Sequence, residues 1–343
     1  MTLFAMIACS IFAQVPVREP ASSSPRVHKI AVGGEGGWDY LTVDPDARRL
    51  YVARGNRVVV IDVDKETVVG ELADTPGVHG IAIVPALGKG FTSNGSDSSV
   101  AVFDLKTLKA TGKIKARGVP DAILYDPASN RVVTFNHGTN DGTVIDPATE
   151  KVVGTIDFKG EPEAAVADGK GRIFVNIRSS SEIAEIDPVA LKILNRWTLA
   201  PGQRPNGLAI DAKNRRLFSG CNGNSKMVVM DADKGTVLAR VDIGRGSDGC
   251  GFDAARGIAY SANGGDGTVT VIGEPEPGKF KVVATIPTQP TARTMTLDPR
   301  THRLYLSAAT PAPASAAAAA KPKAKGGRRG TVPGSFVIVV VGD

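Results

Sequence analysis

Residues 38–72 read WDYLTVDPDARRLYVARGNRVVVIDVDKETVVGEL, and this stretch decides the fold class. It holds four short apolar runs (LTV, RLYVA, VVVI and VVGEL) separated by turn-forming residues. An Asp-Pro pair follows the first run, a Gly-Asn pair follows the second, and an acidic turn beginning at Asp62 follows the third. Such residues favour tight reversals of the chain. The stretch therefore predicts four short antiparallel strands and no helix.

The same pattern recurs with a period near 42 residues. Asp62, at the end of the third run, recurs as Asp104, Asp146, Asp187 and Asp231, with Gly273 in the sixth place. The turn after the first run recurs seven times along the chain, at Asp44, Val84, Asp126, Asp168, Asp211, Asp253 and Asp298. Seven copies of four strands, without a crossover helix, predict an all-β fold: a seven-bladed β-propeller with four antiparallel strands in each blade.

The two ends of the chain complete the predicted ring. The seventh copy ends after its third run, at 337–341, and so lacks a fourth strand. Residues 27–32 (VHKIAV) have the character of that missing outer strand. We expect this N-terminal strand to close the last blade, because an unpaired strand edge would otherwise remain. Residues 27–343 then form a single propeller, preceded by a linker at 14–26.

These repeats carry a family resemblance. The runs RRLYVA, RIFVN and RLYLSA, and the Val-x-Val-Ile-Asp run with its threonine turn, resemble the YVTN (YncE-like) repeat family over residues 27–343. No Gly-His dipeptide occurs in the sequence, so the combination of Gly-His and Trp-Asp that marks WD40 repeats is missing. The resemblance implies a propeller and export from the cytoplasm. It implies no reaction, because members of the family differ in activity.

The N-terminus predicts export independently. Residues 1–13 (MTLFAMIACSIFA) are apolar and uncharged, which is typical of a signal peptide. The usual basic segment before it is missing, which is consistent with a truncated start. We expect a periplasmic or secreted protein, with lipoprotein anchoring through Cys9 as the less favoured alternative. In an oxidising compartment Cys221 and Cys250, in adjacent blades, could form a disulfide.

A segment inside the seventh copy departs from the repeat. Residues 309–334 are rich in Ala, Pro and Lys, and we predict a disordered insertion there. The formal net charge of the chain is +6, and five basic residues of this segment supply most of it. Weak binding of single-stranded nucleic acid through this loop is one alternative function. No aromatic side chains accompany the charges, so we expect no stable nucleic-acid partner.

Two further patterns are better explained by turns than by ligands. The pairs Asp62/Asp64 and Asp231/Asp233 resemble the start of a calcium loop but lack its glycine and distal glutamate. Residues 244–249 match the GxGxxG spacing, yet a strand follows them where a dinucleotide site needs a helix.

A ring of polar residues is the strongest functional signal. Aligning the seven inner strands on their turns places one polar residue five positions upstream in every copy. These residues are Asp39, His79, Asp121, Glu163, Asn206, Asp248 and Arg293. Inner strands line the axis of a propeller, so we predict that the seven form a ligand-binding ring at the mouth of its channel. The alternative is that strand entries are polar simply because they are solvated.

The ring supports two classes of function. The preferred one is a binding or scaffold protein, expected to be a monomer without a transmembrane segment, that takes a small molecule, a metal-bearing ligand or a peptide at this face. The alternative is a hydrolase or lyase with Glu163 or Asp121 as base and His79 or Arg293 assisting. His79 and His137 fall on the same face of neighbouring blades and are weak candidates for a metal site. The sequence identifies no cofactor.

Overall fold

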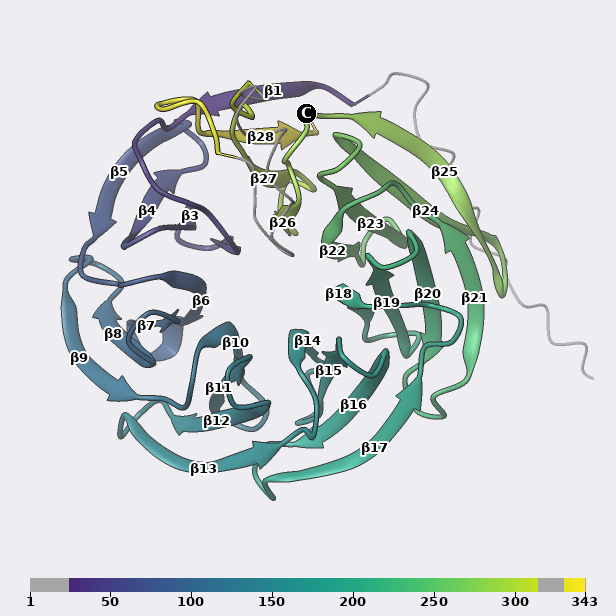
Figure 1. Ribbon diagram of the computed structural model, residues 1–343, viewed down its shortest axis with the longest axis horizontal. Coiled ribbons are helices and arrows are strands. Elements are labelled where there is room, and N and C mark those ends of the chain that lie inside the picture. Colours follow the sequence, from purple (N-terminus) through teal and green to yellow (C-terminus); the bar gives the residue numbers. More distant parts are fainter. Residues whose placement is uncertain (1–24, 314–329, 343) are drawn as a thin grey trace, which may run out of the picture.

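A computed structural model describes residues 25–313 and 330–342 (Figure 1). They form seven four-stranded antiparallel sheets arranged radially about a central axis, which confirms the seven-bladed propeller. The predicted signal peptide and most of the linker lie outside the described residues. No helix in the described part of the chain is long and apolar enough to cross a membrane.

In the first six blades the strands follow the chain from the axis outward. Blade one contains β2 (Leu41–Asp44), β3 (Arg49–Arg54), β4 (Arg57–Asp62) and β5 (Thr67–Leu72), and blade two contains β6 (Val78–Val84), β7 (Lys89–Asn94), β8 (Ser99–Asp104) and β9 (Ala110–Lys115). Blade three contains β10 (Pro120–Asp126), β11 (Arg131–Asn136), β12 (Asp141–Asp146) and β13 (Lys151–Asp157), and blade four contains β14 (Pro162–Ala167), β15 (Ile173–Ile177), β16 (Glu182–Asp187) and β17 (Lys192–Thr198). Blade five contains β18 (Pro205–Asp211), β19 (Arg216–Cys221), β20 (Lys226–Asp231) and β21 (Val237–Asp242), and blade six contains β22 (Ser247–Asp253), β23 (Ile258–Asn263), β24 (Thr268–Glu276) and β25 (Lys279–Pro287). Blade seven contains β26 (Thr294–Leu297), β27 (Leu304–Ala308), β28 (Val337–Val341) and β1 (Val27–Ala31). One 3₁₀ turn, η1 (Pro85–Leu87), is the only helical element among the described residues.

The N-terminal strand closes the ring as predicted. β1 pairs antiparallel with β28, from Val27 opposite Val341 to Ala31 opposite Val337. The amide of Gly342 donates to the carbonyl of Arg26 at 2.9 Å and extends this pairing by one residue. Blade seven therefore has four strands, and its third strand is covered on both sides.

The apolar core lies between neighbouring blades. Phe135 and Ile156 of blade three pack with Val175 and Ile186 of blade four, and all four are buried. Burial of each such side chain contributes about 1.5–3 kcal/mol relative to exposure. This packing fixes each inner strand between its neighbours, and so it fixes the residues at the strand ends.

The aspartate turns close one end of the inner strands, which we call the lower rim. Six of its seven turns begin with a buried aspartate whose carboxylate accepts backbone N–H groups two to four residues further on. Three of these carboxylates also contact a basic side chain of the next blade, in the pairs Arg48–Asp298 (2.7 Å), Arg215–Asp168 (2.9 Å) and His302–Asp253 (2.8 Å). The lower rim therefore links blades through acids that their own turns already hold.

The predicted disordered insertion, residues 309–334, includes ordered residues at both of its ends. Ala309 is buried, and Pro311 forms an antiparallel bridge with Thr331. These ends are ordered because they pack onto blade seven: the amide of Ala309 donates to the Thr291 hydroxyl at 3.1 Å. Residues 314–329 lie outside the described part of the chain.

Candidate functional site

The opposite end of the inner strands, the upper rim, carries the predicted ring, and β-bulges position its members. In five blades the pairing between the first two strands shifts at the ring residue, as between Pro120 and Ile123 around Asp121 and between Pro162 and Ala165 around Glu163. A bulge re-aims the side chain that it carries. Three of these strands begin with a proline, at Pro120, Pro162 and Pro205, where the missing N–H costs the sheet no hydrogen bond.

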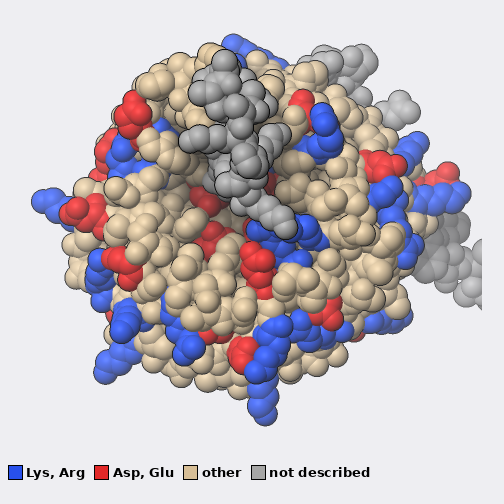
Figure 2. Space-filling view, viewed as in Figure 1, with Lys and Arg blue, Asp and Glu red and all other residues tan. Residues whose placement is uncertain are grey.

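All seven ring residues line a single cavity of about 670 Å³. Figure 2 shows acidic side chains around a hollow near the axis, with basic side chains beside them. Glu163, Asp121 and Asn206 are each no more than 5% exposed, so these three members of the ring are not solvated strand entries. The structure thus brings together every residue that the alignment selected. That they bind a ligand stays a prediction.

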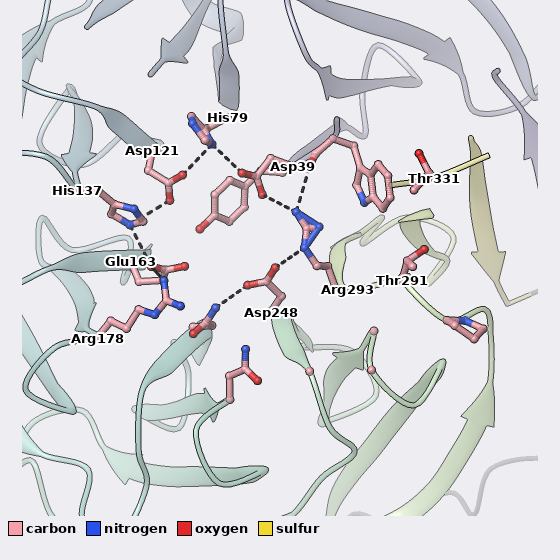
Figure 3. Close-up of a pocket in the computed structure, with 18 of the residues that line it drawn as sticks. Asp39, His79, Asp121, His137, Glu163, Arg178, Asp248, Thr291, Arg293 and Thr331 are labelled. Atoms are coloured by element: carbon pink, nitrogen blue, oxygen red, sulfur yellow. Dashed lines mark hydrogen bonds and ion pairs between the residues drawn. The ribbon is translucent and has the colours of Figure 1, made fainter. Parts of the chain in front are cut away.

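Carboxylates and imidazoles alternate along one wall of the cavity (Figure 3). His79 Nδ1 lies 2.7 Å from Asp39 Oδ2 and 2.9 Å from Asp121 Oδ1. His137 Nε2 lies 3.3 Å from Asp121 Oδ2 and 3.0 Å from Glu163 Oε2. The two oxygens of Asp121 therefore face two different imidazoles. Each ring nitrogen in turn faces two different carboxylates.

Arginines end this series on both sides. Arg293 Nε lies 2.8 Å from Asp248 Oδ2, and its Nη2 lies 3.6 Å from Asp39 Oδ1. Arg178 Nη1 lies 3.4 Å from Glu163 Oε2. The four carboxylates that line the cavity thus outnumber the two guanidiniums by two. With neutral imidazoles, the wall carries an excess of two negative charges.

Burial and crowding shift the proton affinities of this wall. Burial acts to lower the pKa of His79, but hydrogen bonds to Asp121 and Asp39 outweigh it and raise that pKa to about 10. Burial is likewise outweighed at His137, where Glu163 and the charge of Asp121 raise the pKa to about 9. Burial raises the pKa of Glu163 to about 7, against the hydrogen bond from His137 and with the charge of Asp121. In the metal-free protein both imidazoles are therefore cationic at neutral pH.

Aromatic groups complete the wall near blade one. The guanidinium of Arg293 lies 5.6 Å from the centre of the Trp38 ring and donates to the Trp38 carbonyl at 3.0 Å. Burial and the charge of Asp121 raise the pKa of Tyr40 well above its usual value, so its phenol stays neutral. These contacts fix the Arg293 side chain beside the acids.

One buried acceptor in the cavity has no partner among the described residues. Asn206 is 4% exposed, and its Nδ2 donates to Asp248 Oδ1 at 2.7 Å. Its Oδ1 is buried without a hydrogen bond. An unsatisfied buried acceptor costs about 1–3 kcal/mol, and a water molecule or a ligand donor in the cavity would satisfy this atom.

Three of the lining residues that lie outside the alignment of inner strands come from the ends of second strands. His137 was a weak metal candidate, and Arg178 and Asn222 were not predicted to be site residues. All three directly follow the second strand of their blade, in blades three, four and five. The other four blades have Gly or Ala in this place, at Gly55, Gly95, Gly264 and Ala309. A second alignment on the ends of the second strands would have found them.

Two groups of residues on the wall could hold a metal ion. Asp39, His79 and Asp121 form one, Asp121, His137 and Glu163 the other, and the ligand atoms of each lie within 4.8 Å of one another. Imidazole and carboxylate donors suit Zn²⁺, Mn²⁺ and Fe²⁺. His137 is thus a possible metal ligand together with two ring residues, although it follows a second strand rather than an inner one.

The two cysteines lie in adjacent blades but are free thiols, so the predicted disulfide is not formed in this structure. Alternation along β19 explains this. A Cβ at Gly220 would lie 2.8 Å from Cys250 Sγ, so that thiol packs on the face of β19 that Gly220 presents. Cys221, the next residue, points to the opposite face. Burial raises the pKa of each thiol to about 12.

Comparisons with known proteins support the fold alone. No protein-family model matches the chain, and no curated protein matches its sequence. The WD40 repeats of RRP9 superpose with a TM-score of 0.76 and 10% identity over 93% of this chain and 99% of that chain. U3-55K gives 0.74 and 11% over 92% and 98%. Hydrazine synthase of Kuenenia stuttgartiensis gives 0.69 and 16% over 79% and 92%.

These likenesses confirm a propeller of seven blades. At such identities they say nothing of family or function. Membership of the YVTN (YncE-like) family therefore stays a prediction from the repeat residues.

Proposed function

We propose that this protein is a binding propeller that takes a small cationic ligand, either a free divalent metal ion or a compound that carries one, in the upper-rim cavity. The observation that carries the proposal is the set of four carboxylates and two imidazoles that line one cavity with only two guanidiniums. A divalent ion that displaces the imidazole protons meets two surplus negative charges, and walls of low dielectric strengthen the attraction.

The volume of the cavity favours a small ligand over a peptide. A volume of about 670 Å³ falls within the range of small-molecule sites. The lone acceptor of Asn206 lies on the same wall as Asp248 and offers one directional contact to a ligand larger than an ion. A metal ion with an organic partner would use both the acids and this amide.

The proposal is tested by calorimetric titration of the full chain with Mn²⁺ and with Zn²⁺. The double variant Asp121→Asn/Glu163→Gln keeps size and hydrogen bonding but removes two charges. We expect its affinity to fall at least tenfold, which is about 1.4 kcal/mol. The matched control, Glu71→Gln/Asp242→Asn, removes two exposed acids and should bind within twofold of the wild type. Equal affinity in the two double variants would place the site elsewhere.

A hydrolase or lyase remains the second candidate, and Glu163 favours it. A carboxyl whose pKa is raised to about 7 can exchange protons near neutral pH. If the cavity catalyses a reaction, the rate at saturating substrate should show a limb near pH 7 that Glu163→Gln abolishes. A rate profile without that limb argues against Glu163 as base.

We also propose that the protein is exported and acts as a monomer in the periplasm or outside the cell. The apolar residues 1–13 and the resemblance of the repeats support this. Intact mass of protein recovered from its own compartment tests it, because cleavage after residue 13 removes a defined mass. Full-length protein retained in the cytoplasm would contradict it.

A further inference from the structure

We propose that the cavity holds two divalent metal ions side by side, with the carboxylate of Asp121 bridging them. This rests on the proposed function and makes it specific. One subsite consists of Asp39, His79 and Asp121, and the other of Asp121, His137 and Glu163. Each would supply one imidazole nitrogen and two carboxylate oxygens.

The strongest reason is the way the imidazoles face the acids. A ring nitrogen carries at most one proton and donates it along one direction. Yet His79 Nδ1 faces two carboxylate oxygens, at 2.7 and 2.9 Å, and His137 Nε2 faces two at 3.0 and 3.3 Å. One proton cannot serve both acceptors of such a nitrogen well. A metal ion can bind the nitrogen and both oxygens at once.

The spacing of the donor atoms fits this chemistry. Metal bonds of about 2.1 Å in a tetrahedral site place the ligand atoms about 3.4 Å apart. The nitrogen–oxygen separations on this wall run from 2.7 to 3.3 Å, so the ligand atoms need to move apart by a few tenths of an ångström to receive an ion (Figure 3). Small outward rotations of the carboxylates would complete each subsite.

Asp121 is built to be the bridge. It lies at the β10 bulge and is 5% exposed, so its orientation is set by the backbone and its surroundings. Its Oδ1 faces His79 and its Oδ2 faces His137 (Figure 3). A carboxylate that gives one oxygen to each ion is suited to two ions about 3.5–4 Å apart.

The charge of two bound metal ions and of the cavity wall together indicates which further ligand the cavity would hold. Two divalent ions exceed the two surplus negative charges of the wall with neutral imidazoles. Hydroxide or an anionic ligand would therefore occupy the coordination positions that the protein leaves open. The class of ions is that preferred by mixed nitrogen and oxygen donors: Mn²⁺, Fe²⁺, Co²⁺ and Zn²⁺.

The experiment counts ions in the full chain. Protein stripped with a chelator is loaded with Mn²⁺ or Zn²⁺, freed of excess by gel filtration and analysed for metal. We expect two ions per wild-type chain, one in His79→Gln and one in His137→Gln, and none in Asp121→Asn. His302→Gln, an imidazole of the lower rim that also contacts an acid, is the matched control and should retain two. Circular dichroism checks that each variant folds.

A second measurement tests the bridge itself. Two Mn²⁺ ions that share a carboxylate are exchange-coupled, so the electron paramagnetic resonance spectrum should differ from that of isolated Mn²⁺. Two ions without coupling would overturn the bridging role of Asp121. One ion per chain would overturn the pair and leave the proposed function intact. No retained ion, together with no binding in the calorimeter, would overturn both.

Discussion

Both rims of the propeller carry buried carboxylates, but the groups that stabilise these carboxylates differ between the rims. At the lower rim, each buried aspartate is held by the amides of its own turn, as Asp126 is by Ala128 and Ser129. At the upper rim, Asp121 and Glu163 face side chains of other strands and neighbouring blades. Local hydrogen bonds satisfy the first set. The second set depends on imidazole and guanidinium groups from other strands and blades.

Proton affinities express this difference. Burial acts to raise the pKa of Asp298, but hydrogen bonds from Arg48 and from the amide of Arg300 outweigh it and hold the pKa below its usual value. Burial raises the pKa of Glu163 to about 7, and the neighbouring charge of Asp121 adds to the rise. An acid that its turn already stabilises is a structural group. Acids that crowd one another are arranged for a ligand.

The largest effect that separates the rims should come from Asp298→Asn. The change replaces the buried carboxylate that accepts from Arg48 at the junction of blades one and seven with an amide, and the guanidinium keeps only its exposed acidic partner, Asp64. Breaking a buried ion pair costs several kcal/mol, and we expect the free energy of unfolding to fall by about 3 kcal/mol. Urea denaturation of both proteins at neutral pH measures this.

Glu163→Gln is the control at the upper rim. It removes a carboxyl that crowding already disfavours, so the free energy of unfolding should change by less than about 1 kcal/mol. Equal losses in the two variants would mean that both rims are structural.

Stability should also respond to pH with opposite signs at the two rims. The pKa of Asp298 is lower in the folded than in the unfolded chain, so its contribution is complete above about pH 4 and is lost as the pH falls through the folded value. The pKa values of His79 and His137 are raised to about 10 and 9. Their contribution is complete below about pH 6.5 and is lost as the pH rises through 9 to 10.

Urea denaturation of metal-free protein between pH 3 and 10 separates these contributions. His79→Gln/His137→Gln should remove the alkaline decline, which we expect to be about 2 kcal/mol after screening. Asp298→Asn should reduce the acid decline, to which other acids with a lowered pKa also contribute, and leave the alkaline one. An alkaline decline that persists in the histidine variant would show that other groups cause it.

The fold could be predicted almost completely because each blade repeats the same local signals. Alternating apolar runs and aspartate turns act within about forty residues, and seven copies in phase leave one arrangement. The closing strand was predictable because the last copy lacks a partner for 337–341. The order of residues 309–313 and 330–334 was not, since it comes from contacts with blade seven.

The site was predictable only where the repeat fixes it. The ring residues occupy one repeat position, so an alignment on turns selects all seven without knowledge of the structure. Which of them touch was hidden, because Asp121 and His137 approach through a bulge and the end of a second strand. The disulfide failed for a similar reason. Adjacent blades bring two cysteines near, but alternation along β19 directs Cys221 to the wrong face.

The smallest effect should come from Gly95→Ala, which tests whether the space around one imidazole matters. A Cβ at this position would lie 2.7 Å from His79 Nε2, so the ring must shift relative to Asp39 and Asp121. The backbone at Gly95 is not in the left-handed region, and the free energy of unfolding should change by no more than about 0.5 kcal/mol. Affinity for Mn²⁺ should fall about fivefold, because only one imidazole is displaced. Gly37→Ala is the control, since its Cβ meets nothing within 4 Å. If calorimetry gives both alanine variants the same affinity, the position of the His79 ring does not determine binding, and the upper rim would hold its cation through the carboxylates alone.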